Sequence, residues 1–451
     1  MKIVIVGCGN VGRTLTEQLS REGYDITIID EQEQLVKTVS NSCDVMGVVG
    51  NGASLEIQQE AGVDKADMLI AVTRSDERNL LCCLIAKKAG AKHTIARVSN
   101  PVYSREVEFI REELGLSMVI NPQRAAAREI ERLLKFPSAL KIDEFSKSRV
   151  DLINYSVNEG SPLCNMKLKD MPSQIGRGVL IPVVERDDDV IIPGGDFEIK
   201  PKDVISIIGS SAKTVEFFRK LKEPTSIVKD VMIVGGSKTC YYLAQNLIEM
   251  GVSVKIIERD KDTCDKLSEM LPQALIIHGD ATDRELLMEE GISQVQAFIS
   301  LTNIDEENVM LTLFAKSVSK AKLITKVHRV TYDKIIDNLE IGSVVYPKNI
   351  SAEIIIKYVR AMDNSDENNI ESLYRLNENR VEAIEFTVPK GSPVAGKQLL
   401  ELSIKPNIII ACITHNGNVV IPNGQSVIQE GDSVILVTTN KGLSDIKDIL
   451  R

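Results

Sequence analysis

The sequence has no tryptophan, only 4% aromatic residues and four histidines in 451 residues. The histidines stand apart from one another, so we expect each to have a structural or surface role. The eight cysteines are also scattered, with no CxxC pair and no spacing typical of metal ligands, which indicates reduced thiols in a cytosolic protein. We therefore predict no metal site.

The chain also lacks any apolar run near the roughly 18 to 20 residues that cross a bilayer, and its start lacks the features of a secretory signal. A net charge of −10 and a pI near 5.2 argue against sequence-independent binding of nucleic acid, which depends on lysine and arginine. At this length several domains are expected. The sequence predicts a multidomain cytosolic protein without a nucleic-acid partner.

What the chain does contain is a glycine motif at its start. A β-rich apolar run, Lys2 to Val6, precedes the motif, a helical segment follows it, and a second apolar run ends in Asp30. This order of strand, glycine turn, helix, strand and acidic residue is the dinucleotide-binding fingerprint in its proper context. We expect phosphates to lie at the helix N-terminus. The residues concerned are Gly7, Cys8, Gly9, Asn10, Val11, Gly12 and Arg13.

The three glycines have separate expected roles. Gly7 permits the tight turn, Gly9 lets the backbone approach a pyrophosphate, and Gly12 lets the helix lie near the strand. Arg13 either adds positive charge to a phosphate or is a solvated helix residue. Asp30 can accept hydrogen bonds from the ribose hydroxyls, and a 2′-phosphate would meet like charge there, which favours NAD over NADP.

Three more candidates follow the later strands of this domain. Asn51 either contacts the adenine edge or only forms its turn. Thr73 ends the run Leu69 to Thr73, and Arg97 lies at the carboxyl end of the next strand, where open α/β sheets bind ligands. Arg97 contacts a phosphate or forms a structural ion pair.

The same pattern recurs later in the chain. With an offset of 228 residues, Gly7 aligns with Gly235, Gly12 with Cys240 and Asp30 with Glu258. Beyond the second strand the offset is 229, and AVTRSDERNLL at residues 71–81 aligns with SLTNIDEENVM at residues 300–310. A constant offset over this distance indicates an internal duplication.

The second copy has an altered glycine motif. Ser237 replaces the glycine of closest pyrophosphate approach and Cys240 replaces the packing glycine, so phosphate binding should suffer more than folding. Candidate ligand contacts remain at five positions, Gly235, Gly236, Glu258, Asp280 and Lys326. We expect a weaker or altered site, or one without a physiological ligand.

Alternating strands and helices predict an α/β protein with two Rossmann-like, doubly wound parallel sheets. A short β-rich segment with turn residues follows each, and GSPLCNMKL at 160–168 resembles GSPVAGKQL at 391–399. We predict four domains, 1–138, 139–225, 226–364 and 365–451, the second and fourth being small α+β modules. Proline-started helices, 122–136 and 347–362, precede the small modules, and the polar NSDENN that follows the second helix is a natural linker. The apolar IIIKYV at 354–359 lies in an assembly surface or in the chain's own core.

An NAD-dependent oxidoreductase is the main alternative function. Such an enzyme needs a proton donor or acceptor near the nicotinamide, and we find no candidate constellation of catalytic residues. There is no GxxxxGKS loop for ATP hydrolysis. A redox-sensing repressor would need a basic recognition element, which the acidic composition opposes. The pattern favours binding without catalysis.

The module order, the KIVIVGCGNVGRTL opening, the GNGAS and GDATD turns and the GSP-started small modules resemble the TrkA family, the cytosolic subunits of Trk potassium uptake systems. Its members consist of RCK domains, regulators of potassium conductance, with N and C parts repeated twice. The resemblance implies a non-enzymatic peripheral protein on the cytoplasmic face of the membrane that binds NAD(H) or ATP/ADP. It also implies a homotetrameric ring beneath a TrkH-type membrane subunit that conducts potassium. The family's first-site residues match at Gly7 to Gly12, Asp30, Thr73 and Arg97.

Overall fold

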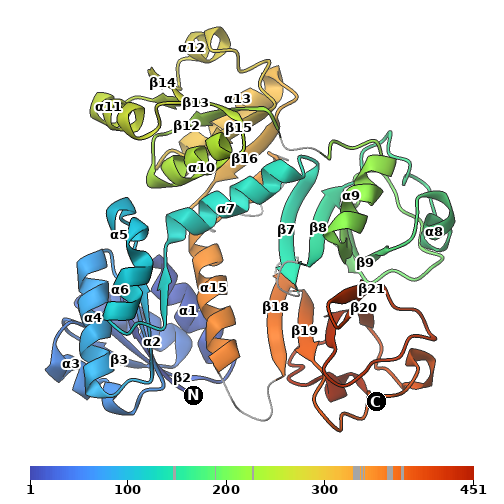
Figure 1. Ribbon diagram of the computed structural model, residues 1–451, viewed down its shortest axis with the longest axis horizontal. Coiled ribbons are helices and arrows are strands. Elements are labelled where there is room, and N and C mark those ends of the chain that lie inside the picture. Colours follow the sequence, from blue (N-terminus) through green and yellow to red (C-terminus); the bar gives the residue numbers. More distant parts are fainter. Residues whose placement is uncertain are drawn as a thin grey trace. The chain divides into compact units, whose positions relative to one another are not determined.

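A computed structural model describes residues 1–145, 149–187, 189–225, 228–328, 336, 339, 341–362, 369–376 and 380–451. The chain forms two compact units: Met1–Glu131 with Lys229–Val359, and Arg132–Val228 with Arg360–Arg451. The first unit holds two parallel sheets and the second holds two antiparallel sheets (Figure 1). The predicted fold class is therefore confirmed. The proposed linker NSDENN lies outside the described residues except for Asn369.

The first parallel sheet has the strand order β3-β2-β1-β4-β5-β6, the Rossmann order, which reverses direction between β1 and β4. Its elements are β1 Lys2–Val6, α1 Asn10–Arg21, β2 Asp25–Asp30, α2 Glu33–Cys43, β3 Met46–Val49, α3 Leu55–Glu60, β4 Met68–Ala71, α4 Asp76–Ala89, β5 His93–Arg97, α5 Pro101–Arg105, α6 Val107–Glu113, β6 Met118–Ile120 and α7 Pro122–Lys135.

The second parallel sheet repeats this order as β14-β13-β12-β15-β16-β17. Its elements are β12 Asp230–Val234, α10 Lys238–Glu249, β13 Ser253–Glu258, α11 Lys261–Met270, β14 Leu275–His278, α12 Arg284–Glu289, β15 Ala297–Ser300, α13 Asp305–Val318, β16 Lys322–Lys326, β17 Ser343–Val345 and α15 Pro347–Met362.

Both faces of the first parallel sheet are buried, as its continuous apolar strands require. On one face Val4 and Val6 form a cluster with Cys82, Cys83 and Ala86 of α4. Successive side chains of a strand point to opposite faces, so Ile3 and Ile5, both buried, serve the other face. The layers place the carboxyl ends of β1 and β4 side by side at the sheet's topological switch point, where ligands bind in this architecture.

The IIIKYV segment lies on α15 and is part of the chain's own core. Ile355, Ile356 and Val359 are at most 2% exposed. The intramolecular alternative therefore accounts for these three side chains, and no second chain is needed to cover them.

The second unit contains two five-stranded antiparallel sheets, ordered β10-β9-β11-β8-β7 and β18-β19-β22-β20-β21. The elements of the first are β7 Ala139–Phe145, β8 Val150–Ser156, α8 Met171–Gln174, β9 Val179–Arg186, β10 Asp189–Ile191, β11 Val204–Ser210 and α9 Ser211–Lys220. Those of the second are β18 Ile370–Leu376, β19 Val381–Thr387, β20 Ile408–His415, β21 Asn418–Val420 and β22 Ser433–Thr438, with short 3₁₀ turns at Leu399–Glu401 and Ile446–Ile449.

The two small sheets share a hydrophobic cluster. Phe145 of the first packs edge-on against Tyr374 of the second, with ring centroids 4.6 Å apart. The Tyr374 hydroxyl donates a hydrogen bond to the Glu144 carbonyl at 2.8 Å. Their common cluster draws Val150 and Leu152 from one sheet and Ala411 from the other, so the repeated small modules are stabilised by each other.

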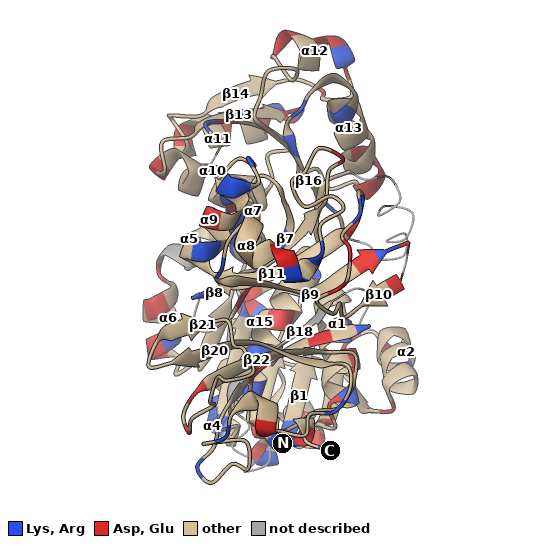
Figure 2. Ribbon diagram, turned by 90° about the vertical axis from the view of Figure 1, so that its right-hand side faces the viewer, with Lys and Arg blue, Asp and Glu red and all other residues tan. Residues whose placement is uncertain are grey.

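Acidic and basic side chains are interspersed along the elements (Figure 2). Within the described residues no helix is long and apolar enough to cross a bilayer. The same residues contain no group of three or more histidine, cysteine or carboxylate side chains placed to hold a metal ion.

Candidate functional site

The first glycine turn connects β1 to α1 and needs glycine at two positions for steric reasons. Gly7 has a φ of +106°, and its N–H donates to the Ile29 carbonyl at 2.8 Å. A Cβ on Gly12 would lie 1.8 Å from the Gly7 carbonyl oxygen. A Cβ on Gly9 would meet nothing within 4 Å, so at Gly9 the protein leaves open space. This is the arrangement in which a bulky anion can approach the backbone.

The N-terminus of α1 has no side-chain cap. Gly9 is the N-cap, and no acidic residue lies in the first turn. The first turn of a helix leaves backbone N–H groups without intrahelical partners, here those of Asn10, Val11 and Gly12. With the helix dipole, these groups favour an anion at the open space beside Gly9.

Asp30 is fixed by the glycine turn itself. Its Oδ2 accepts a hydrogen bond from the Cys8 N–H at 2.7 Å, and its Oδ1 accepts one from the Gln32 N–H at 3.0 Å. The Cys8 thiol is buried, and burial followed by the charge of Asp30 raises its pKa to about 12. Cys8 is thus a neutral packing residue whose backbone orients the carboxylate.

Thr73 and Arg97 belong to a network at the carboxyl ends of β4 and β5. Asn79 Oδ1 accepts hydrogen bonds from the Thr73 N–H at 2.9 Å and hydroxyl at 2.7 Å. Asn79 Nδ2 donates to the carbonyls of Thr73 and Arg97. Sequence reasoning did not assign Asn79 a role, although the aligned Asn79 and Asn308 were a signal that it has one.

Arg97 donates from Nη1 to the Thr73 carbonyl at 2.8 Å. Its Nε is buried without a partner, and burial lowers its pKa. Arg97 thus bonds to a backbone carbonyl, whereas the sequence suggested either a phosphate contact or an ion pair. A phosphate contact for Arg97 stays a prediction.

Two other candidates show the simpler of their foreseen roles. Arg13 Nε lies 2.8 Å from Glu17 Oε1 on the surface of α1, and this hydrogen bond raises the pKa of Arg13. Asn51 Oδ1 accepts from the Ala53 N–H at 2.9 Å, so the side chain shapes its own turn. Ligand contacts by Arg13 and Asn51 stay predictions.

The second glycine turn repeats the first in its backbone. Gly235 has a φ of +97° and donates to the Ile257 carbonyl at 2.9 Å. Glu258 accepts from the Gly236 N–H at 2.5 Å and from the Asp260 N–H at 2.8 Å, as Asp30 does from its two N–H groups. A Cβ on Gly236 would lie 2.8 Å from the end of the Leu267 side chain, which would have to shift to admit it.

The helix N-terminus differs between the copies. The Ser237 hydroxyl caps α10 by accepting a weak hydrogen bond from the Cys240 N–H at 3.4 Å. Cys240 is fully buried at the position of Gly12, and burial raises the pKa of its thiol. In the second copy a serine side chain therefore caps the helix N-terminus, whereas in the first copy the helix N-terminus has no side-chain cap.

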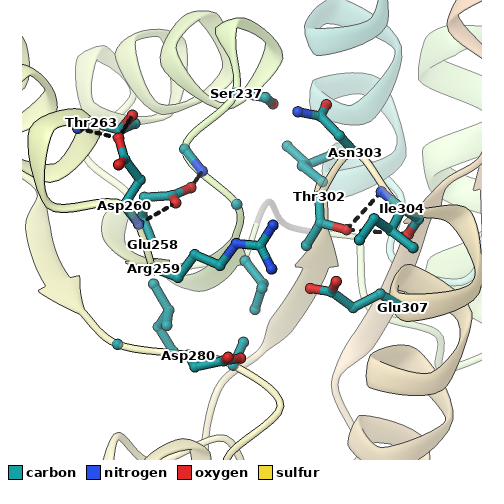
Figure 3. Close-up of a pocket in the computed structure, with 17 residues that line it drawn as sticks. Ser237, Glu258, Arg259, Asp260, Thr263, Asp280, Thr302, Asn303, Ile304 and Glu307 are labelled. Carbon is teal, nitrogen blue, oxygen red and sulfur yellow. Dashed lines mark hydrogen bonds between the residues drawn. The ribbon is translucent and has the colours of Figure 1, made fainter.

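A cavity of about 290 Å³ lies over this second turn (Figure 3). Its lining includes four of the five predicted contacts, Gly235, Gly236, Glu258 and Asp280. Lys326 is not part of the lining: it is 3% exposed and donates from Nζ to the Leu301 carbonyl at 2.8 Å. Burial lowers the pKa of Lys326 to about 8.

The chain thus consists of a tandem repeat in which each half pairs a Rossmann-type domain with a small β module. The chain matches the TrkA-N domain over residues 3–122 and 231–347 and the TrkA-C domain over residues 152–222 and 383–451. It is 32% identical to the Trk system potassium uptake protein TrkA of Halomonas elongata, covering 100% of this chain and 98% of the relative. The TrkA of Haemophilus influenzae is 31% identical, with 98% and 96% covered.

Among solved structures, the GsuK channel bound to NAD superposes with a TM-score of 0.61 at 18% identity. The match covers 98% of this chain and 77% of that one. At this identity the likeness shows the fold. The domain matches and the full-length relatives together establish that the chain belongs to the TrkA family, as its sequence motifs indicated.

Proposed function

We propose that this chain is the cytosolic regulatory subunit of a potassium uptake system. Its first cleft binds NAD(H) or ATP/ADP, and the bound nucleotide controls a TrkH-type membrane subunit that conducts potassium. The observation that carries the proposal is the match along the whole chain to proteins named for Trk potassium uptake. A channel of the same fold that binds NAD supports the choice of ligand.

The geometry of the first cleft supports nucleotide binding as a signal. The uncapped N-terminus of α1, the open space at Gly9 and the fixed carboxylate of Asp30 provide places for phosphates and ribose. The only thiol in the turn, Cys8, is buried and protonated at neutral pH, so it is no nucleophile. The proposed role is binding without turnover.

Regulation then requires two arrangements of the assembly. A nucleotide shifts their balance only by the difference between its affinities for the two. We propose a homotetramer at the cytoplasmic face of the membrane, in which eight nucleotide-type domains form a closed ring. Which nucleotide favours the conducting arrangement is settled by transport measurements.

The test is calorimetry of the full chain with NAD, NADH, ATP and ADP. We expect binding of at least one of them, loss of that binding in Gly9→Trp, and co-purification with a potassium-conducting membrane protein. The folding control is the circular dichroism of Gly9→Trp, which should match that of the wild type because Gly9 faces open space. Consumption of NADH with any metabolite would support the oxidoreductase alternative instead.

A further inference from the structure

The two clefts are built from aligned residues, but their charges differ. At four positions the first copy carries two arginines, Arg74 and Arg78, and two carboxylates, Asp30 and Glu31. Their aligned counterparts Asn303, Glu307, Glu258 and Arg259 all line the second cavity. Two other positions are neutral in the first copy and acidic in the second: Gln32 aligns with Asp260, and Asn51 aligns with Asp280.

The lining of the second cavity is consequently acidic. It contains four carboxylates, Glu258, Asp260, Asp280 and Glu307, and a single arginine, Arg259. A cleft lined mainly by one sign of charge concentrates its potential and repels ligands of the same sign. A pyrophosphate entering this cavity would therefore meet repulsion that the first cleft does not exert.

The phosphate position of the second cleft is also occupied by the protein. Ser237 places a Cβ and a hydroxyl where Gly9 leaves open space, and that hydroxyl already accepts from the Cys240 N–H. This obstacle to phosphate binding is independent of the acidic lining, because it concerns the helix N-terminus and not the cavity wall. Both features act against a phosphate.

The base and ribose positions, in contrast, are retained. Glu258 is held in the same way as Asp30, with both oxygens oriented by backbone N–H groups. Arg259 extends into the cavity toward Thr302 and Glu307 (Figure 3). A guanidinium in this place can stack on a flat aromatic base.

A residue that is unfavourable for local structure lines the same cavity. Ile304 is the N-cap of α13, where the first copy has Ser75, whose hydroxyl accepts from the Arg78 N–H. Isoleucine cannot cap a helix, and its side chain is 43% exposed in the cavity lining. The second copy thus has an exposed apolar side chain where the first copy has a capping serine, and an apolar side chain at this place suits a site that contacts a base.

We propose that the second cleft binds an adenosine-type nucleoside, a base with its ribose and without phosphate, and that Arg259 contacts the base. The cavity of about 290 Å³ lies at the lower end of the range for small-molecule sites, which suits this size. The proposal rests on the nucleotide-binding role proposed for the fold, and it assigns different ligands to the two clefts.

The experiment uses the full chain with Gly9→Trp, so that only the second cleft can respond. Calorimetry with adenosine, AMP, ADP and NAD should give the highest affinity for adenosine and about a tenfold loss for each added phosphate. Equal or tighter binding of ADP or NAD would overturn the proposal, and so would the absence of binding by all four. The NAD titration of the chain with Gly9 intact reports separately on the first cleft, so the two proposals fail independently.

Matched variants use residues of the first cleft as replacements. Asp260→Gln with Asp280→Asn should reduce the preference for adenosine over ADP at least tenfold, because two carboxylates leave the cavity. Arg259→Glu should weaken adenosine binding about tenfold or more in the Gly9→Trp chain. In the chain with Gly9 intact, the same substitution should leave NAD binding to the first cleft unchanged. An unchanged adenosine affinity in Arg259→Glu would remove that residue from the site.

Discussion

The Asp30 carboxylate and the Cys8 N–H are joined by a hydrogen bond of 2.7 Å, which connects the end of β2 to the glycine turn after β1. The bond links the expected ribose contact to the expected phosphate contact, so neither can move alone. The same link joins Glu258 to Gly236 in the second copy. A carboxylate with defined orientation is what recognition of two hydroxyl groups requires.

Asp30→Ala should lower NAD affinity by about 10-fold to 100-fold, since it removes a charged acceptor that a ribose would use. It also leaves the Cys8 N–H without its partner, which should destabilise the domain by about 1 to 3 kcal/mol. Calorimetry and chemical denaturation measure the two effects. Asp30→Asn retains one oxygen for Cys8 and is the control: it should keep most of the stability while binding still falls.

The same added methyl group should destabilise the protein at Gly12 and leave its stability nearly unchanged at Gly9. Gly12→Ala brings a Cβ to within 1.8 Å of the Gly7 carbonyl oxygen and should destabilise the first domain by about 3 kcal/mol or more. Gly9→Ala adds a methyl to open space and should change stability by less than about 0.5 kcal/mol while weakening nucleotide binding. Hydrogen exchange of α1 amides reports on the first domain alone, which a multidomain unfolding curve does not. Equal protection in both variants would contradict the packing role of Gly12.

The sequence predicted the repeat, the turn at Gly7 and the close packing of Gly12, because these features depend on the order of residues along the chain. The turn at Gly7 and the helix starting at Pro122 are properties of short segments. The network around Asn79 was not predicted, since it connects residues 18 positions apart through backbone atoms whose positions only the sheet defines. The run to Thr73 was expected to be strand throughout, but β4 ends at Ala71 because the Thr73 N–H bonds to a side chain instead of a neighbouring strand.

The position of the Lys326 side chain could not be predicted from the sequence either. Its alignment with Arg97 suggested that its ammonium group contacts a ligand. In the structure the ammonium group is buried and donates to the Leu301 carbonyl, an orientation that depends on tertiary packing. Its pKa of about 8 in the folded chain lies below the ordinary value of 10.5, so the unfolded chain binds this proton more tightly. Stability should therefore rise with pH between about 8 and 10.5, and the burial penalty is fully present below that interval.

Lys326→Met should remove this pH dependence and stabilise the second domain near pH 7 by up to about 3 kcal/mol, less the lost hydrogen bond to Leu301. Thermal unfolding of both proteins from pH 7 to 10 measures the difference, which should shrink as pH rises. A difference that is constant with pH would mean that burial does not lower the pKa of Lys326 in the folded chain. The neighbouring Lys322, whose pKa burial lowers to about 7, is common to both proteins and cancels in the comparison.

The shared core of the small modules predicts that they unfold together. Phe145→Ala should cost about 3 to 5 kcal/mol, because it opens a cavity between the two sheets. Hydrogen exchange should then increase in β18–β22 as well as in β7–β11. Tyr374→Phe, which keeps the ring and loses the hydrogen bond to the Glu144 carbonyl, is the milder control at about 1 kcal/mol. Increased exchange confined to β7–β11 would show that the modules are independent.

The pair of Glu31 and Arg78, 2.7 Å apart beside Asp30, gives a prediction on cofactor choice. Both side chains are well exposed, so the pair adds little to stability, and its charges matter mainly to a ligand. A 2′-phosphate on the ribose would lie near Asp30 and Glu31, and the wild type should therefore prefer NAD to NADP.

Glu31→Arg combined with Arg78→Glu reproduces the arrangement of Arg259 and Glu307 in the second copy. Because it brings a guanidinium to the 2′ position and keeps Asp30, this double variant should reduce the preference for NAD over NADP about tenfold in calorimetry. Arg78→Glu alone is the control, since it adds negative charge without supplying the guanidinium, and its preference for NAD should increase instead.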